Sequence, residues 1–315
     1  MKKDRVCAVV VTYNRKELLG ECLTALLNQT VVPDKIILIN NASTDGTLEY
    51  LDEKGFSARP ELEIITEEEN LGGAGGFYEG LRHIRARRAE FDWAWVMDDD
   101  TIPQPDALEG LIRTWHRLRR KVSFLASCVY GPEGESMNVP EIDMKPSPNG
   151  YRDWYTSLDN SCVRISNATF VSLLIRVNAI ARCGLPCKDY FIWGDDTEYT
   201  SRLIKYYGPA YLTGSSKVIH KRVNASALSL RRENDTGRIR MFHYFYRNNL
   251  INRELYQGPR SLLHFLLGAV RESVRCLPTK NGIEKFKVVY RGIGEYAQER
   301  KKFRHYINGQ LHRSR

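Results

Sequence analysis

Three consecutive carboxylates, Asp98, Asp99 and Asp100, follow the hydrophobic stretch WAWVM. Adjacent carboxylates repel one another, so a fold has little reason to gather them unless a cation compensates their charge. All-oxygen ligation suits Mg²⁺ or Mn²⁺, and either ion would also neutralise a departing diphosphate. Because side chains alternate along an extended backbone, we expect Asp98 and Asp100 to face one ion and Asp99 to face a ribose or sugar hydroxyl. A solvated acidic loop, or a capping cluster before a helix at Asp106, is the alternative.

A second acidic group, Asp195, Asp196 and Glu198, follows the aromatic stretch FIWG and opens a predicted helix. A carboxylate in this position can accept the proton of a hydroxyl, which is the task of a general base in an inverting displacement. We predict Asp196 as this base, with Asp195 and Glu198 binding acceptor hydroxyls or holding backbone groups. Simple helix capping by the two aspartates, with Glu198 in the first turn, explains the spacing nearly as well. The presence of the first acidic group favours catalysis.

His220, in the stretch KVIHKR, ends another apolar segment. A solitary histidine is usually an ordinary core or surface residue. A metal ion held by two carboxylates and a diphosphate still has room for an imidazole, however. We therefore predict that Asp98, Asp100 and His220 bind one Mn²⁺ or Mg²⁺ ion.

The glycine cluster NLGGAGGF follows a predicted strand and precedes a predicted helix. Its spacing does not match a dinucleotide fingerprint, and the turn after the first strand contains no glycine loop, so a nicotinamide enzyme is disfavoured. The glycines would let backbone amides approach a sugar or phosphate, or they would serve only a tight turn. On the first interpretation Asn70, Gly72 and Gly73 contact this sugar or phosphate.

Strand-like and helical patterns alternate through the first hundred residues. The predicted strands cover residues 6–12, 35–40, 63–66 and 93–97, and the predicted helices cover residues 16–29, 44–51 and 76–88. A surface excursion over residues 130–155 precedes another predicted strand over residues 169–177. This order predicts a doubly wound α/β fold with a mixed, mainly parallel sheet, in which ligands bind at the carboxyl ends of strands.

The charge is unevenly distributed along the 315 residues. Residues 226–315 contain 19 Lys and Arg against 7 Asp and Glu, whereas residues 1–225 contain 28 against 31. We therefore expect a boundary near residue 225. Residues 226–315 would form a basic, mainly helical region. The slightly acidic first part offers no stripe for nucleic acid.

One predicted helix of the basic region, residues 261–277, has an apolar face. Its members are Leu262, Leu263, Leu266, Leu267, Val270, Val274 and Leu277. With arginines opposite, such a helix could lie on an anionic membrane surface, although packing against its own domain is the commoner use of the pattern.

The expected compartment is the cytoplasm, with peripheral contact at the inner face of the membrane. No stretch is apolar enough to span a bilayer, and the opening residues do not resemble a signal peptide. Seven cysteines cannot pair completely within one chain, so mostly buried, reduced thiols are expected.

Five motifs in order resemble those of family 2 glycosyltransferases with the GT-A fold, over roughly the first 225 residues. They are VVVTYNR, NNASTDGT, NLGGAGGF, WVMDDD and WGDD with a downstream histidine. The forms NLGGAGGF and MDDD, and FHYFYRNN in the basic region, are similar to the branch that contains bacterial galactofuranosyltransferases and related rhamnosyltransferases.

The resemblance implies that residues 1–225 form the catalytic domain, with a nucleotide-sugar half to about residue 100 and an acceptor half over residues 101–225. It also implies a role for individual residues. Nucleotide-sugar contacts are implied for Thr12, Tyr13, Asn14, Arg15, Asn41, Asp45, Asp98 and Asp99. Trp193 would be an aromatic platform under the acceptor sugar, and Asp196 the catalytic base. Many members of the family have Glu-Asp where this chain has Asp195 and Asp196, a form that the galactofuranosyl branch tolerates.

The resulting hypothesis is an inverting, metal-dependent glycosyltransferase that moves galactofuranose from UDP-galactofuranose to a cell-surface or lipid-linked glycan. The large flanking domains of polymerising members are missing from this sequence, which favours addition of one or a few sugars. Rhamnosyl transfer from dTDP-rhamnose is an alternative, as is a non-catalytic module that binds a nucleotide sugar or a glycan.

Overall fold

The computed structural model describes residues 3–118, 121–222 and 228–312. Its first half is a parallel sheet of four strands, β1 (Val6–Thr12), β2 (Lys35–Asn40), β3 (Leu62–Thr66) and β4 (Trp93–Asp98). The β-branched strand β1 is buried along its whole length, as expected for a strand covered on both faces. Parallel pairing aligns Thr12 with Asn40 and Val11 with Asp98, so these strands end at one edge of the sheet.

The second half extends the sheet with mixed pairing. Its strands are β5 (Thr101–Pro103), β6 (Phe124–Tyr130), β7 (Cys162–Ile165), β8 (Leu173–Arg176) and β9 (Ala210–His220). In the described residues the order is β3-β2-β1-β4-β8-β6-β9-β5, with β7 beside β9. The strand order reverses direction around β1 and β4, and such a reversal is where open α/β sheets bind ligands.

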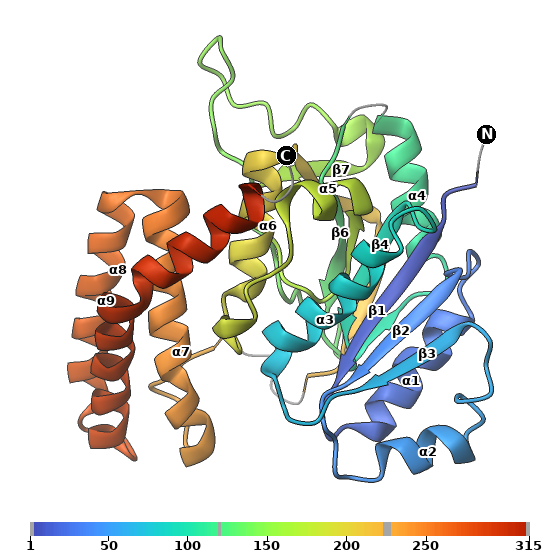
Figure 1. The fold of residues 1–315 in the computed structure, drawn as a ribbon. Coiled ribbons are helices and arrows are strands. Elements are labelled where there is room, and N and C mark those ends of the chain that lie inside the picture. The colour runs from blue at the N-terminus through green and yellow to red at the C-terminus, as the bar shows by residue number, and fades with distance from the viewer. Residues whose placement is uncertain (1–2, 119–120, 223–227, 313–315) are drawn as a thin grey trace.

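Helices cover both faces of the sheet (Figure 1). One face carries α1 (Lys16–Leu27), α2 (Thr47–Glu53) and α4 (Ala107–Leu118), and the other carries α3 (Gly72–Ala86), α5 (Val177–Cys183) and α6 (Asp195–Tyr206). The alternating side chains of β1 enter the two apolar cores in turn, with Val9 in one and Val10 in the other. The doubly wound α/β class predicted from the sequence is confirmed.

The basic region is helical, as predicted. It comprises α7 (Thr236–Asn252), a π-helical segment (Arg253–Gln257), α8 (Pro259–Cys276) and α9 (Gly282–His312). These helices share an apolar core of their own, and Figure 1 shows them beside α6. None of the described helices combines the length and the apolar character needed to cross a bilayer. The predicted domain boundary at residue 225 lies outside the described residues.

Several predicted boundaries were wrong. The strand predicted over residues 169–177 is limited to β8, and β5, β6 and β7 were not predicted. The helix predicted from Gly76 begins at Gly72, so the glycine cluster lies in the first turns of α3. The excursion over residues 131–157 is irregular, as expected, and six of the seven cysteines are buried.

The glycines of α3 permit close packing against the sheet. A β-carbon on Gly80 would lie 2.3 Å from Val9 Cγ1, and one on Gly76 would lie 2.4 Å from Val11 Cγ1. Both distances are far inside van der Waals contact. Part of the cluster is therefore explained by contact of the helix with β1, and not by a ligand.

Gly80→Ala is expected to lower the free energy of unfolding by about 1–3 kcal/mol, because the added methyl group overpacks the contact with Val9. Urea denaturation would measure the change. Gly73→Ala is the matched control, since nothing lies within 4 Å of its β-carbon position. An equal loss in both variants would show that packing against β1 is not the cause.

Candidate active site

The first acidic group lies at the carboxyl edge of the sheet, where β1 and β4 end side by side. Thr12 Oγ1 donates a hydrogen bond to Asp99 Oδ2 at 2.8 Å. Arg15 Nη1 lies 3.3 Å from Asp99 Oδ1 and 2.8 Å from Asp100 Oδ2. Thr12 and Arg15, predicted to line the nucleotide pocket, thus contact two of the three carboxylates directly.

The predicted metal ligands come together from two distant parts of the chain. Potential ligand atoms of Asp98, Asp100 and His220 all lie within 4.8 Å of one another. Pairing of β5 with β9 aligns Thr101 with His220, which places His220 Nε2 3.0 Å from Asp100 Oδ1. Two carboxylates and an imidazole suit a divalent ion such as Mn²⁺ or Mg²⁺.

Asn138 orients the imidazole of His220. Its Oδ1 lies 2.9 Å from His220 Nδ1. A proton on Nδ1 would be donated to this oxygen and would leave the lone pair of Nε2 facing the carboxylates, which is the arrangement typical of histidines that bind metal. Asn138 belongs to the irregular excursion and had no predicted role.

The charges of this cluster are only partly compensated. Burial and the neighbouring Asp100 raise the pKa of Asp98 to about 8. Burial also raises the pKa of Asp99, to about 6, against the opposing charge of Arg15. Although burial acts to raise the pKa of Asp100, the hydrogen bond and charge of His220, together with Arg15, hold it below the ordinary value. A cation would remove the remaining repulsion.

Two predicted donor contacts, Asn14 and Asp45, hold the turns together. Asn14, which has a positive φ of 54°, accepts a hydrogen bond from Thr44 N through Oδ1 at 2.7 Å. Asp45 Oδ2 accepts one from Lys16 N at 3.2 Å. Tyr13 remains 44% exposed on the same turn.

Asn41 and Asn70 build the start of α3. Asn41 Nδ2 donates to Asn70 Oδ1 at 3.1 Å and to Gly72 O at 3.0 Å. Asn41 Oδ1 accepts from Leu71 N at 3.1 Å, and the side chain is buried. The β-carbon positions of the two glycines predicted to contact the donor differ. That of Gly72 would lie 2.2 Å from Phe191 O, whereas that of Gly73 faces open space among the described residues.

The second acidic group opens α6 after a loop with unusual backbone angles. Phe191, Trp193 and Gly194 have positive φ values of 62°, 60° and 89°. Asp195 and Asp196 follow in the first turn of α6, where the helix dipole favours negative charge.

Burial raises the pKa of Asp196, the predicted base, above its ordinary value. The effect persists although Thr197 donates to Asp196 Oδ1 from its backbone at 2.6 Å and from its hydroxyl at 3.2 Å. Burial and the charge of Asp196 raise the pKa of Asp195 further. A carboxylate with a raised pKa is a stronger base, as general-base chemistry requires.

Glu198, predicted to bind the acceptor, is instead fully buried. Its Oε2 lies 2.9 Å from Arg202 Nη2, and its Oε1 accepts a hydrogen bond from Tyr256 at 2.6 Å. Both carboxylate oxygens are therefore used inside the protein, so this prediction was wrong. The first-turn spacing that suggested a ligand contact reflects an ion pair four residues apart on α6.

The loop before α6 lies at the carboxyl edge of the sheet. Ala74 N donates to Phe191 O at 3.1 Å, and a β-carbon on Gly72 would lie 2.2 Å from the same oxygen. Gly72 is itself bonded to Asn41, directly after β2. Trp193, the predicted acceptor platform, is half-buried and packs against Phe242 of α7 with ring centroids 4.9 Å apart.

Three residues of α7 that had no predicted role also contact this loop. Arg247, Asn248 and Asn252 donate hydrogen bonds to backbone carbonyls between Asp189 and Gly194. Arg247 and Asn248 belong to the stretch FHYFYRNN, which indicated a family resemblance but did not predict a contact with this loop.

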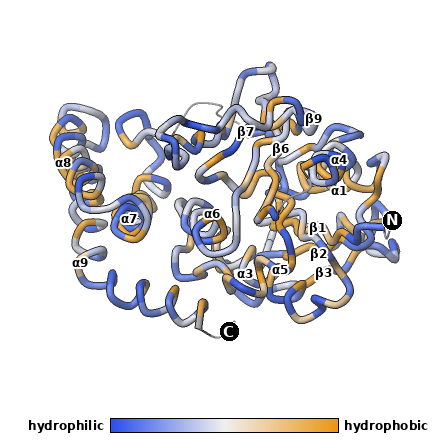
Figure 2. The backbone as a smooth tube through the Cα atoms, turned by 90° about the horizontal axis from the view of Figure 1, so that it is seen from above, coloured by the Kyte–Doolittle hydropathy of each residue, from blue (hydrophilic) through white to orange (hydrophobic). Residues whose placement is uncertain are grey.

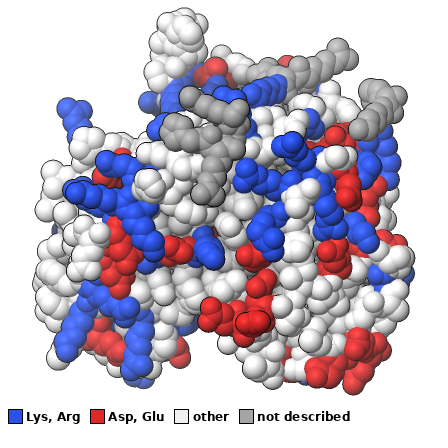
Figure 3. Space-filling model, viewed as in Figure 1, with Lys and Arg blue, Asp and Glu red and all other residues white. Residues whose placement is uncertain are grey.

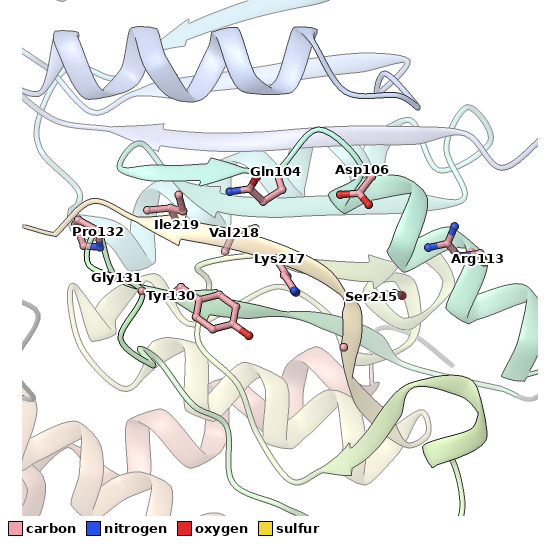
Figure 4. Close-up of a pocket in the computed structure, with 12 residues that line it drawn as sticks. Gln104, Asp106, Arg113, Tyr130, Gly131, Pro132, Ser215, Lys217, Val218 and Ile219 are labelled. Atoms are coloured by element: carbon pink, nitrogen blue, oxygen red, sulfur yellow. The ribbon is translucent and has the colours of Figure 1, made fainter.

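A cavity of about 550 Å³ lies elsewhere, between the start of α4 and the end of β9 (Figure 4). Gln104, Tyr130 and Lys217 are among the residues that line it. It shares no lining residue with either acidic group.

Solved glycosyltransferases share this fold. The structure matches S. aureus TarS with a TM-score of 0.55 at 15% identity, over 87% of this chain and 44% of that one. It matches the Pyrobaculum calidifontis mannosyltransferase PcManGT, solved with GDP-Man and Mn²⁺, with a TM-score of 0.54 at 16% identity, over 94% and 88% of the chains. The GT-A fold class is thereby confirmed.

Two galactofuranosyltransferases are among the sequence relatives. The chain is 28% identical to galactofuranosyltransferase GlfT1 of Mycolicibacterium smegmatis over 203 residues, and 30% identical to that of Mycobacterium tuberculosis over 216 residues. Each match covers 64% of this chain, which spans about 65% of the length of each relative. The family model "Glycosyl transferase family 2" matches residues 7–170, more than half of the sequence. The chain therefore belongs to glycosyl transferase family 2.

Proposed function

We propose that this chain is an inverting, metal-dependent glycosyltransferase that transfers a sugar from a nucleotide diphosphate to a glycan hydroxyl. The observation that carries the proposal is the convergence of Asp98, Asp100 and His220 at the carboxyl edge of the sheet. The acidic group that opens α6, with the half-buried Asp196, supplies a candidate base.

Each residue has a definite task in this proposal. Asp98, Asp100 and His220 would hold Mn²⁺ or Mg²⁺, which when bound offsets the charge of the nucleotide diphosphate. Thr12 and Arg15 bind the two carboxylate oxygens of Asp99 and so fix its orientation beside the metal ligands. Asp196 accepts the proton of the acceptor hydroxyl as its oxygen attacks the anomeric carbon from the side opposite the leaving group.

The donor proposed is UDP-galactofuranose, and the acceptor a cell-surface or lipid-linked glycan. The names of the mycobacterial relatives support the sugar. One donor screen distinguishes galactofuranosyl from rhamnosyl transfer, because the first reaction releases UDP and the second releases dTDP. A non-catalytic binding module would bind metal and nucleotide but consume neither donor with any acceptor.

Asp100→Asn is expected to abolish the Mn²⁺-dependent part of UDP binding, because it removes one of two carboxylate ligands. Titration calorimetry with and without Mn²⁺ would measure the loss. Asp106→Asn is the matched control, since this exposed carboxylate lies outside the cluster. Unchanged Mn²⁺ dependence in Asp100→Asn would exclude the proposed metal site.

Asp196→Asn is expected to lower the transfer rate by about 10²–10⁴-fold while leaving UDP binding intact, because only the proton acceptor is lost. In the wild type, the rate should fall as the pH drops through the raised pKa of Asp196, above the ordinary value of about 3.9, because the protonated carboxyl cannot act as a base. Initial rates between pH 4 and 9 would record this limb. Asp159→Asn serves as the control, and wild-type turnover in Asp196→Asn would require another base.

We further propose that α8 holds the enzyme at the anionic inner face of the cytoplasmic membrane. Successive residues of a helix are turned by about 100°. On α8 this gathers Leu263, Leu267 and Val274, which are 57%, 61% and 54% exposed, on one arc. The opposite arc carries Ala269 and Cys276, which are buried in the core shared with α7 and α9.

Positive charge adjoins the exposed apolar arc. The basic side chains on this flank are Arg260, His264, Arg271 and Arg275, all exposed. Glu272, the acid on α8, is turned inward and accepts a hydrogen bond from Tyr246 at 3.1 Å. Figure 2 shows α8 at the edge of the molecule, and Figure 3 shows Lys and Arg on this helical side. An apolar arc bordered by arginines suits a bilayer that contains anionic lipid.

Replacing Leu263 and Leu267 together by Glu is expected to abolish flotation with vesicles that contain phosphatidylserine, because charge would replace the inserted surface. Arg271→Ala should weaken binding roughly fivefold, since a basic residue near an anionic surface contributes about 1 kcal/mol. Leu48→Glu is the control, as Leu48 is an exposed leucine on α2. Flotation of the double variant equal to that of the wild type would contradict the proposal. If the wild type were a dimer and the double variant a monomer, the arc would instead be the contact with a second copy of the chain.

A further inference from the structure

The loop that leads into α6 has a backbone that needs external restraint. Phe191 adopts φ 62° and ψ −62°, a tight turn in which Ile192 N donates to Tyr190 O at 2.7 Å. Trp193 also has a positive φ, of 60°. Such conformations cost about 1–3 kcal/mol each in residues with a side chain, and they persist only where surrounding contacts enforce them.

Asn248 of α7 supplies a large part of this restraint. Its Nδ2 lies 3.0 Å from Tyr190 O, 3.0 Å from Ile192 O and 2.8 Å from Trp193 O. One amide group thus gathers three carbonyls from four consecutive residues. The Asn248 side chain is completely buried, so water cannot substitute for it.

Two neighbours on α7 complete the set of contacts. Asn252 Nδ2 donates to Gly194 O at 2.8 Å, and Asn252 Oδ1 accepts from the hydroxyl of Tyr190 at 2.8 Å. Arg247 Nη2 donates to Asp189 O at 2.7 Å. The carbonyls that these contacts bind end directly before Asp195.

Arg247 also determines which way the amide of Asn248 points. Arg247 Nε donates to Asn248 Oδ1 at 2.9 Å, so the NH₂ end must face the loop. Arg247 Nη1 in turn lies 3.1 Å from Glu299 Oε2 of α9. Tyr190 packs against Phe303 of α9 with ring centroids 5.2 Å apart. The loop is therefore connected to two helices of the basic region.

We propose that Asn248 is a positioning residue for the catalytic base, acting through the carbonyls of residues 190–193. The proposal rests on the proposed role of Asp196. Because Asp196 lies three residues after Trp193, the conformation of this loop determines where its carboxylate lies. The basic helical region is then a structural part of the active site, and its function is not limited to membrane contact.

Asn248→Ala is expected to lower kcat by about 10²-fold, the effect of displacing a catalytic group by roughly 1 Å. The dissociation constant for UDP with Mn²⁺ should stay within about twofold, because the donor contacts lie on other elements. Asn249→Ala is the matched control, because Asn249 Nδ2 donates within α7, to Phe245 O at 2.9 Å. It should retain wild-type kcat.

Asn248→Asp separates hydrogen bonding from simple filling of space. The carboxylate has the same shape but would face three carbonyl oxygens and lose every donor. We expect kcat to fall at least as far as in Asn248→Ala. Wild-type kcat in Asn248→Asp would exclude the positioning role. The role would also be excluded if Asn248→Ala lowered the melting temperature but kept wild-type kcat at temperatures where the variant is folded.

Hydrogen exchange in the full-length protein gives a readout independent of turnover. Amides of residues 191–197 should exchange faster in Asn248→Ala than in Asn249→Ala, and equal exchange would overturn the proposal. If the wild type transferred no sugar, the proposed function would fail while this exchange test still decided the restraint. If Asn248→Ala does not fold, Asn252→Ala takes its place, because it removes the hydrogen bond to Gly194 O. This variant is expected to show the same faster exchange and a lower kcat. Wild-type exchange and wild-type kcat in Asn252→Ala would contradict the positioning role.

Discussion

The arrangement of the site depends on the repulsion among three carboxylates at the end of β4, of which Asp98 is half-buried and Asp99 and Asp100 are buried. Burial raises the pKa of Asp98 to about 8 and that of Asp99 to about 6, so their negative charges are costly without partners. Arg15 from the turn after β1 and His220 from the end of β9 reduce this cost. The elements that deliver these two residues therefore meet at β4, and a divalent ion would complete the compensation.

Close packing at the same edge joins the two halves of the molecule. Gly72 has no side chain, and this allows the oxygen of Phe191 to approach the start of α3. Asn41 and Asn70 hold that start in place from the end of β2. Asn41, Asn70 and Gly72, which the sequence suggested as donor contacts, thus also form the surface that contacts the loop before α6.

The helical region restrains this loop from its other side. Asn248 and Asn252 bind its carbonyls, and Arg247 connects them to α9. At the same time α8 keeps an apolar arc exposed at the edge of the molecule. The contacts with the loop before α6 and the exposed apolar arc therefore belong to different helices of one region, α7 and α8.

The sequence by itself determined the strands β1, β2 and β4 and the doubly wound class, because unbroken apolar runs are local signals. It also singled out Asp98, Asp100 and His220, whose potential ligand atoms lie within 4.8 Å of one another. It could not show that both carboxylate oxygens of Glu198 are bound by Arg202 and Tyr256, since the burial of a side chain depends on what packs around its helix. Nor could it reveal Asn138 or Asn248, because an asparagine carries the same local signal in a loop, a cap or a core. Only the tertiary structure brings Asn248 to carbonyls 55 to 58 residues earlier in the chain, where the hydrogen bonds decide its role.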